Sequence, residues 1–301
     1  MIGHNKQQTF FKQAYMSGQL SHAYLLTGPE GVGKKLFAKT FAKGLLCEHK
    51  SFFTNCECTA CKQAENNMHP DYHIYEDKEE DSRDEKSNLC IESVRQIAED
   101  LTISAFSGGW RTVIIDNVHV LCLADASAAN ALLKTLEEPG INTVFLLITH
   151  KLDKILPTIR SRCVNMPFEP LLDCELAVVL KNRGIEPDPI LPYAAGSMSM
   201  ALALTDIDVN ELVSSLVDKS LDKLGRQILA MNDKNTFFAA VSVIQGYFLK
   251  IYKYTLNSEI AAFLQYMGNV LKNLAYNVNM PLLLLDFYVK LTDTITSAEI
   301  K

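Results

Sequence analysis

A glycine-rich loop, Gly28–Lys34, separates the apolar run Ala23–Thr27 from the helical pattern of Lys34–Leu46. Its sequence, Gly-Pro-Glu-Gly-Val-Gly-Lys, has the spacing of a phosphate-binding loop, in which backbone N–H groups hold phosphates and the lysine reaches the outer ones. A strand before the loop and a helix after it are the setting that this chemistry requires. An α/β domain with a nucleotide-binding loop is therefore predicted. The candidate nucleotide-binding residues of the loop are Gly28, Gly31, Gly33 and Lys34.

The rest of the first half alternates apolar runs with amphipathic patterns, which predicts a parallel sheet covered by helices on both faces. The predicted strands are Ala23–Thr27, Tyr72–Tyr75, Thr112–Asp116 and Thr143–Thr149. The predicted helices are Lys34–Leu46, the periodic run from Ile91 to Leu101, and Ala126–Glu138, which ends at Pro139–Gly140. The charged run from Glu76 to Lys86 is expected to be a solvated loop.

The second half has a different character. From Pro167 the strand-like runs stop, and helical segments broken by Pro and Gly follow. We expect an α/β domain over 1–166, a small helical domain over 167–205 and a larger helical domain over 206–301.

Composition and charge exclude several classes of protein. Hydrophobic residues make up 48% and charged residues 21%, which indicates a globular chain. No run approaches the ~20 apolar residues that span a bilayer, and the first residues lack the pattern of a secretory signal, so a cytoplasmic protein is expected. A net charge of -6 argues against a broad surface of Lys and Arg for binding DNA phosphates.

Two residues of the predicted nucleotide site, Lys35 and Asn117, depart from what metal-dependent hydrolysis needs, whereas Asp116 is retained. The position after the loop lysine normally carries a Ser or Thr hydroxyl that holds magnesium, but here it is Lys35, so no magnesium site is expected. Asp116, at the end of a predicted strand, can hold a hydrated metal; without the loop it would be read as a turn or capping aspartate. Asn117 stands where an acidic residue would polarise water, and an amide cannot accept a proton at neutral pH.

Four of the eight cysteines are clustered between the first helix and the next strand. They follow the spacing C-x8-C-x-C-x2-C, and four thiolates so close in sequence suit a closed, tetrahedral, structural zinc site. The alternative is four unrelated reduced thiols. The candidate zinc ligands are Cys47, Cys56, Cys58 and Cys61. The other cysteines, Cys90, Cys122, Cys163 and Cys174, are predicted to be buried small side chains, and the seven histidines to have structural roles.

Three sequence blocks, Ser21–Pro29, Asn130–Pro139 and Ile159–Cys163, resemble the bacterial DNA polymerase III clamp-loader family of AAA+ ATPases. The resemblance implies a RecA-like parallel sheet with flanking helices and a zinc module near 47–61, then a small helical lid over 167–205. The all-helical remainder, 206–301, would be an oligomerisation collar. His69–Tyr72 also resembles the family member that does not hydrolyse ATP.

The same resemblance assigns roles to further residues. Arg162, in the Ser-Arg-Cys block, matches the arginine finger that acts in trans on the nucleotide of a neighbouring subunit. The alternative is a surface arginine paired with a carboxylate. Thr149 matches the position that senses the outermost phosphate. Ser199 stands where motor subunits carry a nucleotide-contacting arginine.

Within the family that the chain resembles, Lys35, Asn117 and Ser199 together favour the largely non-hydrolysing stator over the motor subunit. The resemblance implies that such a stator assembles with gamma/tau and delta subunits and helps to load a sliding clamp on primed DNA. Whether ATP still binds is left open by the residues. One alternative is an active gamma/tau-type ATPase, which those three residues oppose. Another is a zinc-bearing DNA-binding protein outside the replisome, which the net charge opposes.

Overall fold

The computed structural model describes residues 1–76, 109–124, 126–231, 233–274 and 278–297. The chain divides into two compact units, Met1–Leu171 and Leu172–Lys301, which are described separately. The predicted helix between Ile91 and Leu101, most of the predicted charged loop, and Cys90 lie outside the described residues. Among the described helices, none is long and apolar enough to cross a membrane.

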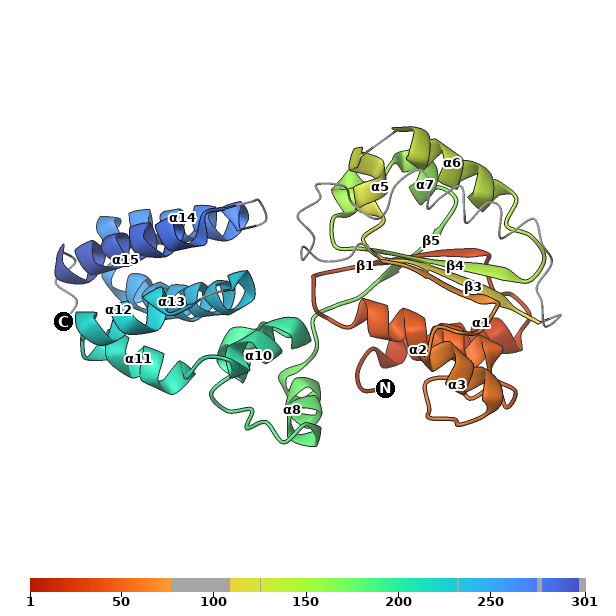
Figure 1. Ribbon diagram of the computed structural model, residues 1–301, viewed down its shortest axis with the longest axis horizontal. Helices are drawn as coiled ribbons and strands as arrows, with labels where there is room; N and C mark the ends of the chain where they lie inside the picture. The colour runs from red at the N-terminus through yellow and green to blue at the C-terminus, as the bar shows by residue number, and fades with distance from the viewer. Residues whose placement is uncertain (77–108, 125, 232, 275–277, 298–301) are drawn as a thin grey trace. The chain divides into compact units, whose positions relative to one another are not determined.

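The first unit is built on a five-stranded sheet in which every neighbouring pair is parallel (Figure 1). In chain order the strands are β1 (Ala23–Thr27), β2 (Tyr72–Tyr75), β3 (Arg111–Ile115), β4 (Thr143–Thr149) and β5 (Val164–Pro167). Their spatial order is β2-β3-β4-β1-β5. Because the strands are parallel, their carboxyl ends share one edge of the sheet, here called the carboxyl edge, and their first residues share the opposite, amino edge.

Helices cover both faces of this sheet, as Figure 1 shows. One face carries α1 (Asn5–Met16), α2 (Lys34–Leu46) and α3 (Thr59–Glu65). The other carries α5 (His119–Ala124), α6 (Ala126–Glu137) and α7 (Pro157–Arg160), and a 3-10 turn, η1 (Leu152–Lys154), precedes α7. The layers confirm the predicted α/β architecture.

Strand β1 contributes to a separate core on each face. Tyr24 and Leu26 are buried in the core that includes α2, whereas Ala23 and Leu25 are buried in the core that includes α6. Side chains alternate between the faces of a strand, so a strand buried on both faces is a continuous apolar run. The phosphate loop that follows β1 is therefore anchored to a strand that is buried along its whole length.

The second unit is helical throughout its described residues, as the sequence predicted. Its helices are α8 (Asp173–Asn182), α9 (Leu191–Ala194), α10 (Met198–Thr205), α11 (Val209–Val217), α12 (Leu221–Leu229), α13 (Lys234–Thr255), α14 (Ser258–Asn273) and α15 (Met280–Ser297). Side-chain caps begin several of them: Asp208, Asp233 and Asn257 accept hydrogen bonds from the first turns of α11, α13 and α14. Both α9 and α10 pack against α13. The predicted division into a lid and a collar at residue 205 remains a prediction.

Several predicted boundaries are wrong by one residue, and one strand was missed. Strand β3 begins and ends one residue earlier than Thr112–Asp116, and α6 ends at Glu137 because the chain turns into Pro139–Gly140. Strand β5 was not predicted, because most of its short length is exposed and it lacks an apolar run. The first unit therefore continues beyond 166 to Leu171.

Candidate functional site

Backbone geometry explains the three glycines of the phosphate loop. Gly28, Gly31 and Gly33 have φ angles of 142°, 75° and 99°, which residues other than glycine rarely adopt. A Cβ atom on Gly28 would also lie 2.1 Å from the carbonyl oxygen of Phe168, directly after β5. The loop's shape therefore depends on glycine at these positions.

Lys34 is the first residue of α2 and is buried, with 6% of its surface exposed. Its Nζ donates to the carbonyl oxygen of Gly28 at 2.8 Å and also contacts the carbonyl of Pro29. Burial lowers the pKa of Lys34, while Glu30 and Asp116 act in the opposite direction. The side chain thus turns back over the loop that it belongs to.

Lys35 forms an ion pair with Asp116, the carboxylate that would hold a metal in a hydrolysing site. Its Nζ is 3.1 Å from Asp116 Oδ2 and 3.1 Å from Glu76 Oε2. Burial opposes the charged form of Lys35, but Glu76 and Asp116 together raise its pKa. A permanent ammonium cation therefore pairs with Asp116, whose side chain is only 14% exposed.

Glu76 belongs to this site, although sequence reasoning placed it in a solvated loop. Glu76 also pairs with a second cation, Lys39, whose Nζ lies 2.9 Å from Glu76 Oε1. Burial opposes ionisation of Glu76, and its hydrogen bonds to Lys39 and Lys35 overcome this and lower its pKa. A signal was present, because Glu76 directly follows β2 and the carboxyl ends of parallel strands meet at one edge.

Asn117 follows Asp116 in a left-handed conformation with φ at 50°. Its backbone N–H donates to Asp116 Oδ1 at 3.0 Å, so that the second carboxylate oxygen of Asp116 is also engaged. The structure thus brings Gly28, Lys34, Lys35 and Asp116 together at the carboxyl edge of the sheet.

Thr149, at the end of β4, is fully buried and is held by two groups. Its Oγ1 accepts from the backbone N–H of Lys151 at 3.0 Å and lies 3.2 Å from His119 Nδ1. The ring of His150 meets that of His119 edge-on, with centroids 4.6 Å apart. Burial, together with His150 and Lys151, lowers the pKa of His119 to about 4, so the ring is neutral at neutral pH. The histidine pair escaped sequence reasoning because its members are distant in sequence.

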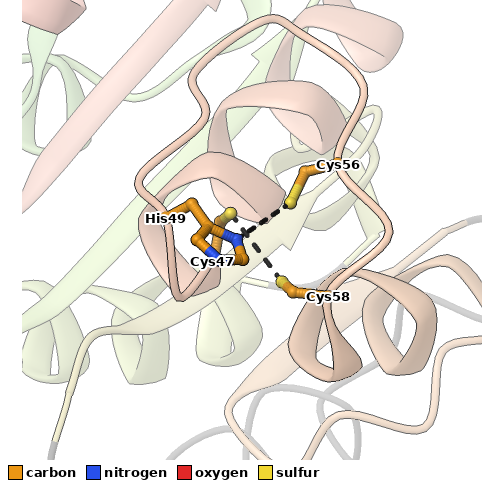
Figure 2. Close-up of side chains that lie close together, drawn as sticks. All are labelled: Cys47, His49, Cys56 and Cys58. Atoms are coloured by element: carbon orange, nitrogen blue, oxygen red, sulfur yellow. Dashed lines mark hydrogen bonds between the residues drawn. The ribbon is translucent and has the colours of Figure 1, made fainter.

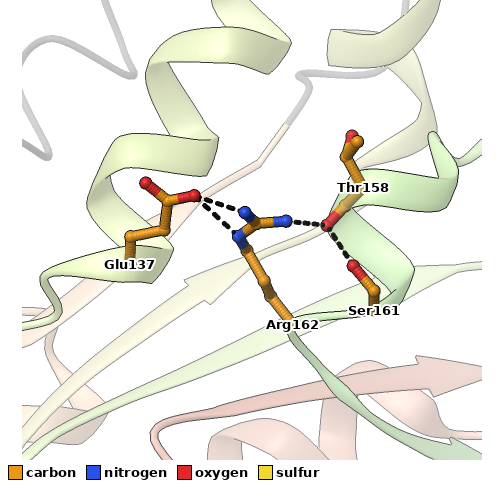
Figure 3. Close-up of polar contacts among 4 residues, drawn as sticks. All are labelled: Glu137, Thr158, Ser161 and Arg162. Atoms are coloured by element: carbon orange, nitrogen blue, oxygen red, sulfur yellow. Dashed lines mark hydrogen bonds and ion pairs between the residues drawn. The ribbon is translucent and has the colours of Figure 1, made fainter.

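Arg162 lies at the other edge of the sheet, after α7 (Figure 3). Its Nε donates to Glu137 Oε1 at 2.9 Å, one terminal nitrogen also contacts that oxygen, and the other donates to the carbonyl of Thr158 at 3.0 Å. The carboxylate pairing predicted as the alternative for this residue is therefore present. The Arg162 side chain as a whole nevertheless stays 35% exposed.

The register of β5 on β1 separates Arg162 from the phosphate loop. Val164 pairs with Tyr24, so Arg162 precedes that pair by two residues, whereas Gly28 follows it by four. At ~3.3 Å per residue the two positions are roughly 20 Å apart along the strand direction. This is too far for Arg162 to contact a phosphate held by its own chain's loop.

Three of the four predicted zinc ligands converge with a histidine (Figure 2). The ligand atoms of Cys47, His49, Cys56 and Cys58 lie within 4.8 Å of one another. The sulfurs of Cys47 and Cys58 are 3.8 Å apart, and His49 Nδ1 is 3.4 Å from the sulfur of Cys56. Tetrahedral zinc with Zn–S bonds of ~2.3 Å separates two sulfurs by ~3.8 Å, so this cluster can hold a metal such as zinc.

Cys61, the fourth predicted ligand, is buried beside the cluster and interacts with Cys47 and Cys58. Burial raises the pKa of Cys61, and the neighbouring sulfurs raise it further. At Cys47 burial also opposes ionisation, but backbone hydrogen bonds from Ser51 and His49 lower its pKa to about 6, which suits a metal-binding thiolate. The sequence signal for His49 was its position two residues after Cys47.

The remaining predicted positions lie apart from these groups. Ser199 is in α10 of the second unit, where its hydroxyl is 3.1 Å from that of Ser197. Cys122 and Cys163 are half-buried, and burial raises the pKa of Cys163 to about 12. The prediction of a buried side chain was wrong for Cys174, which is exposed.

Comparisons with known proteins agree on one family. A family model described as "DNA polymerase III, delta subunit" matches residues 3–172. The delta' subunit of DNA polymerase III from Pseudomonas aeruginosa is 33% identical over 231 residues, which cover 74% of this chain and 68% of that relative. The tau subunit from Bacillus subtilis is 31% identical over 273 residues, which cover 90% of this chain but only 46% of the relative.

The likeness to solved structures concerns the fold. A gamma subunit-related protein of DNA polymerase III from Thermotoga maritima superposes with a TM-score of 0.54 and 18% identity, covering 95% of this chain and 99% of that one.

Proposed function

The chain belongs to the clamp-loader subunit family of DNA polymerase III and has its AAA+ fold, and from this premise we propose that it is a delta-prime-type stator. In this role it does not hydrolyse ATP itself but lends Arg162 to the nucleotide of a neighbouring gamma/tau-type subunit. Its assembly would include gamma/tau and delta subunits and would load a sliding clamp on primed DNA.

The observation that carries the proposal is the ion pair between Lys35 and Asp116, 3.1 Å apart. In phosphate-loop enzymes this aspartate and a loop hydroxyl hold the magnesium ion that neutralises the transferring phosphate. Here Lys35 stands at the position of the hydroxyl, and its ammonium group forms an ion pair with the aspartate, Asp116. Asn117 adds a second deficit, since it supplies no base for the attacking water.

The placement of Arg162 supports action on another chain. The Arg162 side chain is partly exposed at the amino edge, and the register of β1 and β5 places the residue roughly 20 Å from the chain's own loop. A guanidinium is permanently charged and has several N–H donors, so it can stabilise a transferring phosphate that is bound to a neighbouring subunit. A chain that lacks its own hydrolytic groups would therefore still supply a catalytic cation to a neighbouring subunit.

The test is ATP turnover by a reconstituted loader in which only the site adjoining this subunit hydrolyses. We expect Arg162→Ala to lower that turnover by ~10³, the lower end of the range for an arginine finger. Arg160→Ala is the matched control, because Arg160 is an exposed arginine at the end of α7 in the same segment. Unchanged turnover with Arg162→Ala would refute the role of the finger.

An active motor ATPase is the second candidate, favoured by the tau match over 90% of the chain. The purified chain alone separates the two, because a motor would show magnesium-dependent ATP hydrolysis and a stator would not. Hydrolysis that disappears in Lys34→Ala would establish the motor.

We also propose that the cysteine cluster holds structural zinc. Cys47, Cys56 and Cys58 are common to the predicted ligand set and to the observed cluster, and His49 and Cys61 compete for the fourth position. Zinc content of His49→Ala and Cys61→Ser decides between them, because loss of the true fourth ligand lowers the bound metal. Wild-type protein without zinc would refute the site.

A further inference from the structure

Glu137 and Thr158 hold Arg162 from two different helices. Glu137 is the last residue of α6, and Thr158 lies in α7, so the guanidinium is fixed between two elements that pack against each other (Figure 3). The carbonyl of Thr158 also accepts from the Ser161 hydroxyl at 2.9 Å. A long side chain with many rotamers is thereby restricted to one direction.

The contacts leave part of the guanidinium available. Arginine has five N–H donors. Within the described part of the chain, three donor contacts are made, through Nε and one terminal nitrogen to Glu137 and through the other terminal nitrogen to Thr158. Two N–H groups remain on the terminal nitrogens. Two such donors are what a bidentate contact to a phosphate needs.

Without Arg162, the carboxylate of Glu137 would be destabilised by its place at the C-terminus of α6. A helix carries partial negative charge at its C-terminus, so an acidic residue in the last turn is unfavourable. Here Glu137 ends α6, and the exposed Glu138 follows it directly. The bond to Arg162 offsets this repulsion and, in return, sets the direction of the arginine.

We propose that Glu137 is the positioning residue for Arg162: it holds the guanidinium by its Nε side, so that two outward N–H groups are presented to a phosphate on a neighbouring chain. This inference rests on the proposed function of Arg162. Glu137 itself would not contact the nucleotide. It would act only by reducing the number of conformations that the arginine must lose when it engages the phosphate.

The test is a double-mutant cycle in the reconstituted loader with one hydrolysing site. Glu137→Ala should lower kcat by up to ~30-fold, equivalent to the ~2 kcal/mol of rotamer entropy that an arginine carries, and leave KM for ATP unchanged. Glu137→Gln keeps an acceptor oxygen and should recover part of the rate. Glu138→Ala removes the adjacent, exposed charge and should have no effect.

The decisive measurement is Glu137→Ala in the Arg162→Ala background, where we expect no further loss. An additional loss there, or an increase in kcat with Glu137→Ala alone, would overturn the positioning role. If Arg162→Ala itself leaves turnover unchanged, the proposed function fails and the inference fails with it. NMR of the Arg162 Nε–H in the isolated chain tests the contact separately: its proton should exchange faster with water in Glu137→Ala than in the wild type, and equal exchange would contradict the structural premise.

Discussion

Replacing Lys35 by threonine should convert the carboxylates at the carboxyl edge into a magnesium site. The change removes an ammonium group 3.1 Å from both Asp116 and Glu76 and restores the hydroxyl that phosphate loops use to bind the metal. Two carboxylates and a hydroxyl are ligands that magnesium accepts. Without metal, however, Asp116 loses the cation that pairs with it, while Glu76 keeps its ion pair with Lys39.

The expected size of the effect follows from the exposure of these groups. Lys35 is 41%, Glu76 33% and Asp116 14% exposed, so each ion pair lies near the range of ~0.2–1 kcal/mol measured for surface pairs. Lys35→Thr breaks both pairs and should therefore lower the free energy of unfolding by about 0.4–2 kcal/mol in magnesium-free buffer. Magnesium at ten times its Kd should return ~1.4 kcal/mol, because binding to the folded state stabilises it by RT ln(1 + [L]/Kd).

The assay is urea unfolding followed by the fluorescence of Trp110, the chain's one tryptophan, which packs against the core of the first unit. Ionic strength is matched with NaCl, and chelators are avoided because they would compete for the metal proposed at the cysteine cluster. Lys39→Thr is the control, since Lys39 pairs with Glu76 and its loss restores no loop hydroxyl. The reasoning is refuted if magnesium stabilises the wild type as much as Lys35→Thr, or if Lys35→Thr does not respond.

Three further predictions concern stability and metal content. Cys47→Ser should lose bound zinc and lower Tm, whereas Cys174→Ser, which alters an exposed thiol, should keep the metal; atomic absorption measures this, and equal zinc in both would remove the site. Between pH ~6.5 and 4 the unfolded chain binds a proton at His119 that the folded chain does not, so the free energy of unfolding should fall by up to ~3 kcal/mol as the pH is lowered through this range. In urea unfolding, His119→Asn should show a shallower dependence of this free energy on pH than the wild type. Gly28→Ala should cost more than ~3 kcal/mol because its Cβ would meet a carbonyl oxygen at 2.1 Å; Gly18→Ala has nothing within 4 Å and should cost only about 1 kcal/mol, and similar costs would contradict the packing argument.

Local sequence signals identified the strands that are buried on both faces, including β3, whose bounds differ from the prediction by one residue. Strands β1 and β4 are continuous apolar runs, and α2 begins at the lysine of the phosphate loop, so their predicted bounds agree with the structure. Strand β5 lacked such a signal because it is exposed at the edge of the sheet and is held there by hydrogen bonds to β1. Pairing partners of this kind depend on the whole fold.

The site was predicted where one segment supplies the chemistry and missed where separate segments meet. The phosphate loop and Asp116 follow strands that the sequence identifies, and their placement at one edge follows from parallel pairing. The pairing of Glu137 with Arg162 is between residues 25 positions apart, and no local pattern connects them. His49 was overlooked because four cysteines already satisfied the expected number of ligands.

The edge formed by β5 limits how another chain can join this sheet. Four residues long and ending in Pro167, which has no N–H to donate, the strand offers a poor template for an added strand from another molecule. A neighbouring chain that binds at the β5 edge is therefore expected to be held by side-chain contacts. Side-chain contacts of this kind can break and reform separately, without the loss of a continuous ladder of backbone hydrogen bonds.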